Sequence, residues 1–161
     1  QSEWADVDYL FIDLPPGTGD IQLTLSQKIP VTGSVVVTTP QDIALIDAKK
    51  AVDMFQKVNI PIFGVLENMS VHICSHCGHS EAIFGHDGGK HLADKLGVPL
   101  LGQLPLSLPV REAMDAGTAK QMQEAQPAIA EIYTHAAWAL ALAVADKGKD
   151  FSSRFPKIVV E

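Results

Sequence analysis

Short apolar runs rich in β-branched residues alternate with longer amphipathic stretches along this chain. The apolar runs are too short for helices, and we predict strands at Val7–Leu14, Ser34–Thr39, Ile62–Leu66 and Leu100–Leu104. Helices are predicted at Asp42–Val58, Gly89–Leu96, Val110–Ala116 and Pro127–Ala145. This alternation is typical of βαβ units, so we expect an α/β fold in which helices flank a parallel sheet.

The length of 161 residues is enough for one domain with a single core. We assign residues 1–145 to that domain, including a loop at 70–89, and residues 146–161 to a C-terminal tail. The tail is compatible with an added strand, a docking peptide or a disordered end. The apolar stretch before the tail contains Glu131 and is mostly Ala, which favours a helix packed on a soluble core over a membrane span.

Acidic residues outnumber basic ones by 19 to 12, which gives a net charge of −7. This balance argues against binding to nucleic acid or to an acidic membrane surface. Two cysteines cannot form the disulfide framework of a small secreted protein, and the first residues lack the pattern of a signal peptide. We therefore expect a cytoplasmic protein without nucleic-acid or membrane partners.

Polar residues follow two of the predicted strands, at the position where open parallel sheets bind ligands. Asp13 comes near the end of the first strand and precedes the turn Pro15–Asp20, which contains Gly17. A carboxylate there can hold Mg²⁺ through water, and the glycine allows backbone N–H groups to approach a phosphate. The same turn is equally compatible with a rigid strand-to-helix connection. Asn68, after the third strand, suits an adenine edge but is also a common turn former.

The loop VHICSHCGH carries the most distinctive chemistry in the chain. Two residues separate Cys74 from Cys77, so both thiolates can bind one metal centre. Three interpretations are open: an iron–sulfur cluster completed by a second chain, zinc held within one chain together with His86 and His91, or a redox dithiol. The redox interpretation is the weakest, because such a dithiol normally opens a helix, whereas Gly78 indicates an exposed loop.

Five stretches together resemble one family, and they cover nearly the whole chain. They are DYLFIDLPPGTGDIQLTLSQ at 8–27, VVVTTPQDIALIDAKKAVDMF at 35–55, GVLENMSVHICSHCGHSEAIFGHDGG at 64–89, LGQLPLSLPVREAMDAG at 101–117 and the closing FPKIVVE. In this order they resemble the Mrp/ApbC-type iron–sulfur cluster carrier ATPases of the MinD/ParA-like P-loop superfamily. The resemblance implies a P-loop NTPase-like fold and the transfer of a [4Fe–4S] cluster to apo iron–sulfur proteins, coupled to ATP binding and hydrolysis in the complete protein.

The resemblance also implies roles for individual residues at the strand ends. Asp13 would be the Walker B carboxylate that organises Mg²⁺, and Gly17 would be the switch glycine that senses the γ-phosphate. Asn68 would contact the adenine, and Pro105 would lie near the base.

The resemblance assigns Cys74 and Cys77 as cluster ligands, shared with the same residues of a second chain. Two thiolates from each chain make a homodimer a requirement of cluster binding, because a [4Fe–4S] cluster takes four ligands. The main functional expectation is therefore an iron–sulfur cluster carrier. The alternative from another class is a non-catalytic zinc-binding interaction module.

One departure from the family concerns the phosphate-binding loop. No G-x-x-x-x-G-K-S/T motif occurs within the 161 residues, although the family has such a loop before its Walker B strand. The resemblance thus implies a fold that is incomplete without its N-terminal half, and missing strands should leave an open sheet edge. We expect ATP hydrolysis in the complete protein and little of it in this chain alone.

Overall fold

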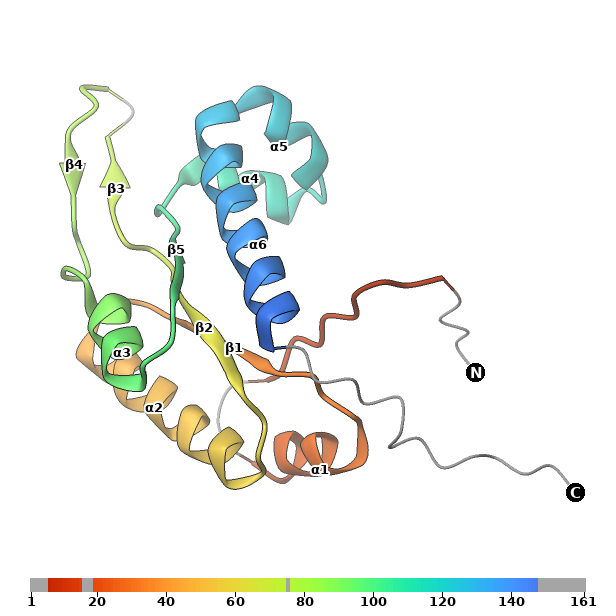
Figure 1. The fold of residues 1–161 in the computed structure, drawn as a ribbon. Helices are drawn as coiled ribbons and strands as arrows, with labels where there is room; N and C mark the ends of the chain where they lie inside the picture. Colours follow the sequence, from red (N-terminus) through yellow and green to blue (C-terminus); the bar gives the residue numbers. More distant parts are fainter. Residues whose placement is uncertain (1–5, 16–18, 75, 148–161) are drawn as a thin grey trace, which may run out of the picture.

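The computed structural model describes residues 6–15, 19–74 and 76–147, and a three-stranded parallel sheet lies at its centre (Figure 1). The strands, in spatial order, are β1 (Ser34–Thr38), β2 (Ile62–Glu67) and β5 (Leu100–Gln103). Parallel pairing brings the carboxyl ends of all three strands to the same edge of the sheet. The predicted α/β class is confirmed, and these three predicted strands are found.

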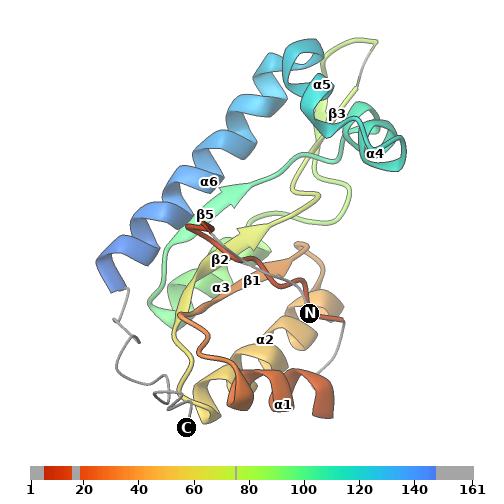
Figure 2. The same cartoon turned by 90° about the vertical axis from the view of Figure 1, so that its right-hand side faces the viewer.

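Helices cover both faces of the sheet (Figure 2). They are α2 (Asp42–Lys57) and α3 (Gly88–Leu96) on one face and α6 (Pro127–Lys147) on the other. The core between the first two helices and the sheet contains the almost fully buried Val52 and Val65. On the opposite face Gly102 allows α6 to approach β5, because an added Cβ would lie 3.0 Å from the Cβ of Ala136.

Short elements surround this core. They are α1 (Asp20–Lys28), β3 (His72–Ile73), β4 (Ser80–Glu81), α4 (Leu108–Asp115) and α5 (Ala119–Ala125). The last two follow β5, and β3 and β4 form an antiparallel hairpin that projects beyond the carboxyl ends of the main strands (Figure 1). The hydrophobic pattern does not predict α1, because Ile21, Leu23 and Leu25 alternate with polar residues as they would in a strand.

The predicted strand at Val7–Leu14 is wrong. This segment is extended, but it pairs with no strand in the described part of the chain, and Phe11 is 74% exposed. A strand needs a neighbour that satisfies its backbone N–H and C=O groups, and an apolar run cannot show whether that neighbour exists. Leu14 is half-buried and packs on the core, so only the end of the segment is held there.

In the described part of the chain the sheet has open edges, as we expected from the strands that the family has before this region. Within the described residues β1 pairs with β2 on one side only, and Val37 of β1 is 57% exposed. An unpaired edge with an exposed apolar side chain is a site for pairing with another segment of chain.

Helix α6 is long and apolar enough to cross a membrane by length and composition alone, which is weak support for a span. One side of it packs on β5 and β2, but only 6% of the apolar stretch Pro127–Asp146 is buried, so the expectation of a helix on a soluble core stays a prediction. Its outer side carries Trp138 and Leu142, which are 65% and 69% exposed. The tail beyond Lys147 lies outside the described residues.

Candidate functional site

The carboxyl ends of β2 and β5 bring two of the predicted site residues to the same edge of the sheet. The backbone N–H of Asn68 donates to the carbonyl of Thr38, at 2.7 Å, so Asn68 directly continues the β1–β2 ladder. The N–H of Leu104 donates to the carbonyl of Glu67, also at 2.7 Å, which sets the buried Pro105 beside this strand end.

Asn68 also makes a tight local turn. Its side-chain Oδ1 accepts the N–H of Met69 at 2.9 Å, and Met69 has a positive φ of 56°. The turn sends the chain away from the sheet and into the hairpin. The interpretation of Asn68 as a turn former is therefore correct, and its role at an adenine stays a prediction.

The structure does not assemble a magnesium or phosphate site from the predicted residues. Asp13 is exposed and lies on the extended segment that is outside the sheet. Gly17 falls outside the described residues. Asn68 and Pro105 are thus the predicted nucleotide residues that lie at the strand ends in the described part of the chain, and the roles of all four residues stay predictions.

The two cysteines lie at the tip of the β3–β4 hairpin. The N–H of Cys74 donates to the carbonyl of His79, and the N–H of Gly78 donates to the carbonyl of Cys74, both at 2.9 Å. Gly78 has a φ of 71°, a left-handed conformation that glycine adopts without strain. Cys74 is half-buried, Cys77 is exposed and both thiols are free. The tight turn places both thiols at one exposed end of the molecule.

Hydrogen bonds at this turn activate one thiol. The backbone N–H of Cys77, then that of His76, and finally the thiol of Cys77 stabilise the thiolate of Cys74 and lower the pKa of that thiol below its ordinary value. Thiolates rather than thiols bind metals and act as nucleophiles. The hairpin therefore favours the thiolate form of Cys74, which is the form that a metal would bind.

Alkylation of Cys74 will reach half its maximal rate at a lower pH in the folded chain than in the urea-unfolded chain. The reason is that only the folded turn supplies the N–H donors that lower its pKa. The rate can be measured with iodoacetamide across pH and assigned to Cys74 by fragmenting, in a mass spectrometer, the peptide that carries both cysteines. Gly78→Ala strains the turn through its positive φ and should move the midpoint toward the unfolded value. Equal midpoints in the folded and unfolded chains would contradict the prediction.

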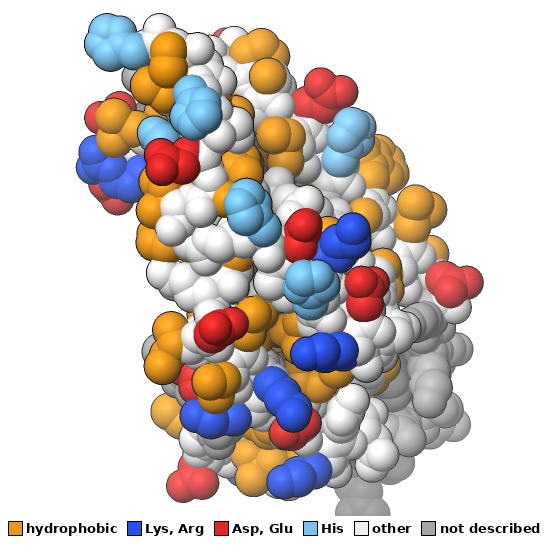
Figure 3. All heavy atoms as spheres, turned by 90° about the vertical axis from the view of Figure 1, so that its left-hand side faces the viewer, with side chains coloured by type: hydrophobic (Ala, Val, Ile, Leu, Met, Phe, Trp, Pro, Cys, Tyr) orange, Lys and Arg blue, Asp and Glu red, His pale blue; other side chains and the backbone are white. Residues whose placement is uncertain are grey.

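Several histidine side chains lie on the face of the molecule that the hairpin and α3 form (Figure 3). The zinc interpretation requires His86 and His91 to join the two cysteines. No group of three or more His, Cys, Asp or Glu side chains close enough to hold a metal ion occurs among the residues that the structure describes. The described residues thus do not bring together the four side chains of the single-chain zinc interpretation.

Sequence reasoning missed Glu67, the last residue of β2. Its side chain is only 1% exposed and accepts hydrogen bonds from Gly89 and Gln103. A carboxyl group that ends an otherwise apolar strand is the signal that could have found it, because such a group needs partners when it is buried.

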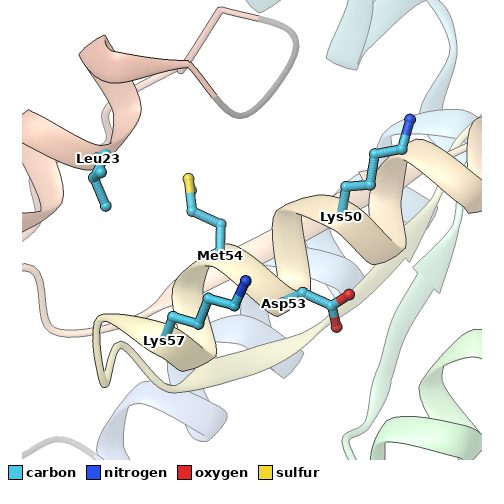
Figure 4. Close-up of a pocket in the computed structure, with 5 residues that line it drawn as sticks. All are labelled: Leu23, Lys50, Asp53, Met54 and Lys57. Carbon is cyan, nitrogen blue, oxygen red and sulfur yellow. The ribbon is translucent and has the colours of Figure 1, made fainter.

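A pocket of about 360 Å³ lies between α1 and α2, away from the strand ends (Figure 4). It is lined by Leu23, Lys50, Asp53, Met54 and Lys57. Lys50 forms an ion pair with Asp47 on the helix surface, at 2.9 Å. None of the predicted site residues that the structure describes line this pocket, and we assign it no role.

A family model described as "NUBPL iron-transfer P-loop NTPase", within the ParA group, matches residues 1–141. The chain belongs to this family. The resemblance drawn from the sequence is thereby confirmed, and so is the P-loop NTPase-like class of the fold.

Relatives of the NUBPL family from bacteria and animals match most of the chain. An iron-sulfur cluster carrier protein of Pseudomonas fragi is 59% identical over 133 residues, which are 83% of this chain and 46% of the relative. The Escherichia coli (strain K12) protein of the same description is 60% identical over 81% of this chain and 35% of its own length. The iron-sulfur cluster transfer protein NUBPL of Mus musculus is 49% identical over 85% of this chain and 43% of its own length.

A solved structure gives an independent comparison. A nucleotide-binding protein of Archaeoglobus fulgidus in complex with ADP superposes with a TM-score of 0.65 and 34% identity, over 72% of this chain and 48% of that one. The chain thus spans less than half the length of each relative described here. The comparison supports the P-loop NTPase-like α/β fold for this member of the NUBPL family.

Proposed function

We propose that this chain is the cluster-binding part of an iron–sulfur cluster carrier. Its cargo would be a [4Fe–4S] cluster held between two copies of the chain and passed to apo iron–sulfur proteins. The observation that carries the proposal is the pair Cys74 and Cys77 on an exposed hairpin tip, in a chain of the NUBPL iron-transfer family.

The ligand count supports a homodimer. One chain offers two thiols at the tip, and the histidines of the described residues do not complete a metal site with them. Four cysteine thiolates are the usual ligands of a [4Fe–4S] cluster, so two chains supply the full set. This count also disfavours the alternative of a zinc-binding module within a single chain.

Exposure of the tip supports transfer rather than storage. Cys77 is exposed and the hairpin projects away from the sheet (Figure 1). A cluster held by exposed ligands is open to attack by the thiolates of another protein, which can then replace the ligands of the carrier. We therefore propose apo-proteins with free cysteines as recipients, in the cytoplasm.

The strand ends supply the nucleotide part of the proposal. Asn68 and Pro105 would meet the base, while ATP, Mg²⁺ and the roles of Asp13 and Gly17 belong to a complete protein that contains the phosphate-binding loop. Asn68 follows β2 and Pro105 follows β5, and these two strands pair directly. The proposed base contacts therefore lie at the end of the sheet where the cysteine hairpin begins.

Metal analysis of the chain after anaerobic reconstitution tests the proposal. We expect about two iron and about two sulfide per chain, because two chains share one four-iron cluster. The solution mass measured on the same sample should be that of a dimer. One zinc per monomer without sulfide would contradict the proposal and support the zinc-binding module instead.

A further inference from the structure

The carboxyl group of Glu67 lies at the junction of three elements. It ends β2, where its backbone pairs with Thr38 of β1 and Gln103 of β5. Its Oε2 accepts the N–H of Gly89 at 2.6 Å, and its Oε1 accepts Nε2 of Gln103 at 2.7 Å. Both carboxylate oxygens therefore accept a hydrogen bond, one from the neighbouring strand β5 and one from the first turn of α3.

The approach of Glu67 to α3 depends on glycine. A Cβ added to Gly89 would lie 2.8 Å from the Cβ of Glu67 and 3.1 Å from its Oε2, too close for any other residue. The first N–H groups of a helix have no partner within the helix and favour a negative charge. In this structure the side chain of Glu67 accepts one of these N–H groups, that of Gly89.

The two arms of the cysteine hairpin are fixed to the sheet in different ways. Backbone hydrogen bonds hold the outgoing arm, from Ser70 N–H to the Leu104 carbonyl at 2.9 Å and from Leu106 N–H to the Val71 carbonyl at 2.8 Å. The return arm, residues 82–89, has no backbone bond to the sheet among the described residues.

Side chains hold the return arm instead. Its hydrogen bonds to the sheet, within the described chain, are the one from Gly89 to Glu67 and a long one of 3.5 Å from Gln103 to Asp87. Close packing adds to them, since a Cβ on Gly88 would lie 2.5 Å from the carbonyl oxygen of Pro40. Glu67 is thus the principal polar link between the return arm and the strand ends.

We propose that Glu67 is a positioning residue for the cysteine hairpin. It holds the return arm on the same strand ends that carry Asn68 and Pro105, so that the two thiols at the tip keep a defined place relative to the nucleotide end of the sheet. The inference rests on the proposed function, because it assumes that these thiols bind a cluster.

Two substitutions distinguish the effect of the Glu67 hydrogen bonds from the effect of its side-chain volume. Glu67→Met fills nearly the same space but accepts no hydrogen bond. Glu67→Gln keeps an oxygen for Gly89, and its amide can donate to Gln103 once the exposed amide of Gln103 rotates. We expect Glu67→Met to release the return arm and Glu67→Gln to retain it.

Hydrogen exchange of the backbone amides tests directly whether the return arm is held on the sheet. In Glu67→Met we expect exchange over residues 82–90 to rise about tenfold, which corresponds to about 1.4 kcal/mol, while β1 and β2 stay protected. After anaerobic reconstitution the same variant should lose iron to a chelator several-fold faster than the parent. Glu67→Gln should match the parent in both measurements.

Val52→Ala is the matched control, since it removes core volume from α2 without touching the hairpin. It should raise exchange throughout the sheet and leave the rate of iron loss unchanged. An equal rise over β1, β2 and residues 82–90 in Glu67→Met would overturn the inference, and so would parent-like behaviour of that variant. A parent chain that takes up no iron or sulfide would overturn the proposed function, and exchange alone would then decide whether Glu67 holds the arm.

Discussion

A chain in which Cys74 and Cys77 are both replaced by alanine will take up no iron or sulfide above background after anaerobic reconstitution. These two thiols are the proposed ligands of the chain, and no group of three or more His, Cys, Asp or Glu side chains in the described residues could hold a metal ion instead. The fold should persist, because both side chains lie on a hairpin tip outside the core. Circular dichroism on the same samples can check this.

Single substitutions should have almost the same effect. Cys74→Ala or Cys77→Ala leaves two of the four thiolates in a dimer, and a [4Fe–4S] cluster needs four ligands. The solution mass of each variant after reconstitution should fall to that of a monomer if the cluster holds the dimer together. A dimer that persists without iron would mean that protein surfaces, rather than the cluster, join the two chains.

Histidine variants provide the matched controls. His86→Ala and His91→Ala remove the two additional ligands of the zinc interpretation, and neither belongs to a metal-holding group in the described structure. They should retain iron and sulfide at the level of the parent. Iron that survives the double cysteine substitution, or zinc that disappears in the histidine variants, would contradict the assignment of the cluster to the hairpin.

The fold could be predicted where a segment's own pattern decides its structure. The buried strand β2 and the amphipathic helix α2 follow directly from runs of apolar residues with periods typical of strands and helices. The extended segment at Val7–Leu14 has a similar apolar run, yet it lies outside the sheet. Its structure depends on a partner strand, and a partner is not a property of the segment itself.

The candidate site, like the fold, could be predicted from the sequence only in part. The ligand pair of the hairpin is visible in the spacing of Cys74 and Cys77, because two intervening residues suffice to bring two thiols to one centre. The link from Glu67 to Gly89 joins residues that are far apart in the chain. Only the packing of α3 against β2 reveals that this acid has a partner and that the glycine must lack a side chain.

This chain alone will hydrolyse Mg–ATP at least about 1000-fold more slowly than a full-length member of the family. Catalysis of phosphoryl transfer rests on positioning and on charges around the β- and γ-phosphates, and the loop that normally provides them has no counterpart within the 161 residues. We do not expect Asp13 to replace it, because Asp13 is exposed on a segment that pairs with no strand of the described chain.

Phosphate release by the purified chain, measured beside Asp13→Ala and a full-length relative, tests this expectation. The chain and Asp13→Ala should both remain at background, since removal of a carboxylate that organises no phosphate has no effect. In a full-length relative the matching substitution should abolish turnover, because there the carboxylate can act together with the phosphate-binding loop. Turnover by this chain that Asp13→Ala abolishes would mean that residues 6–15 move into a catalytic position when nucleotide binds, and that the strand ends suffice for catalysis.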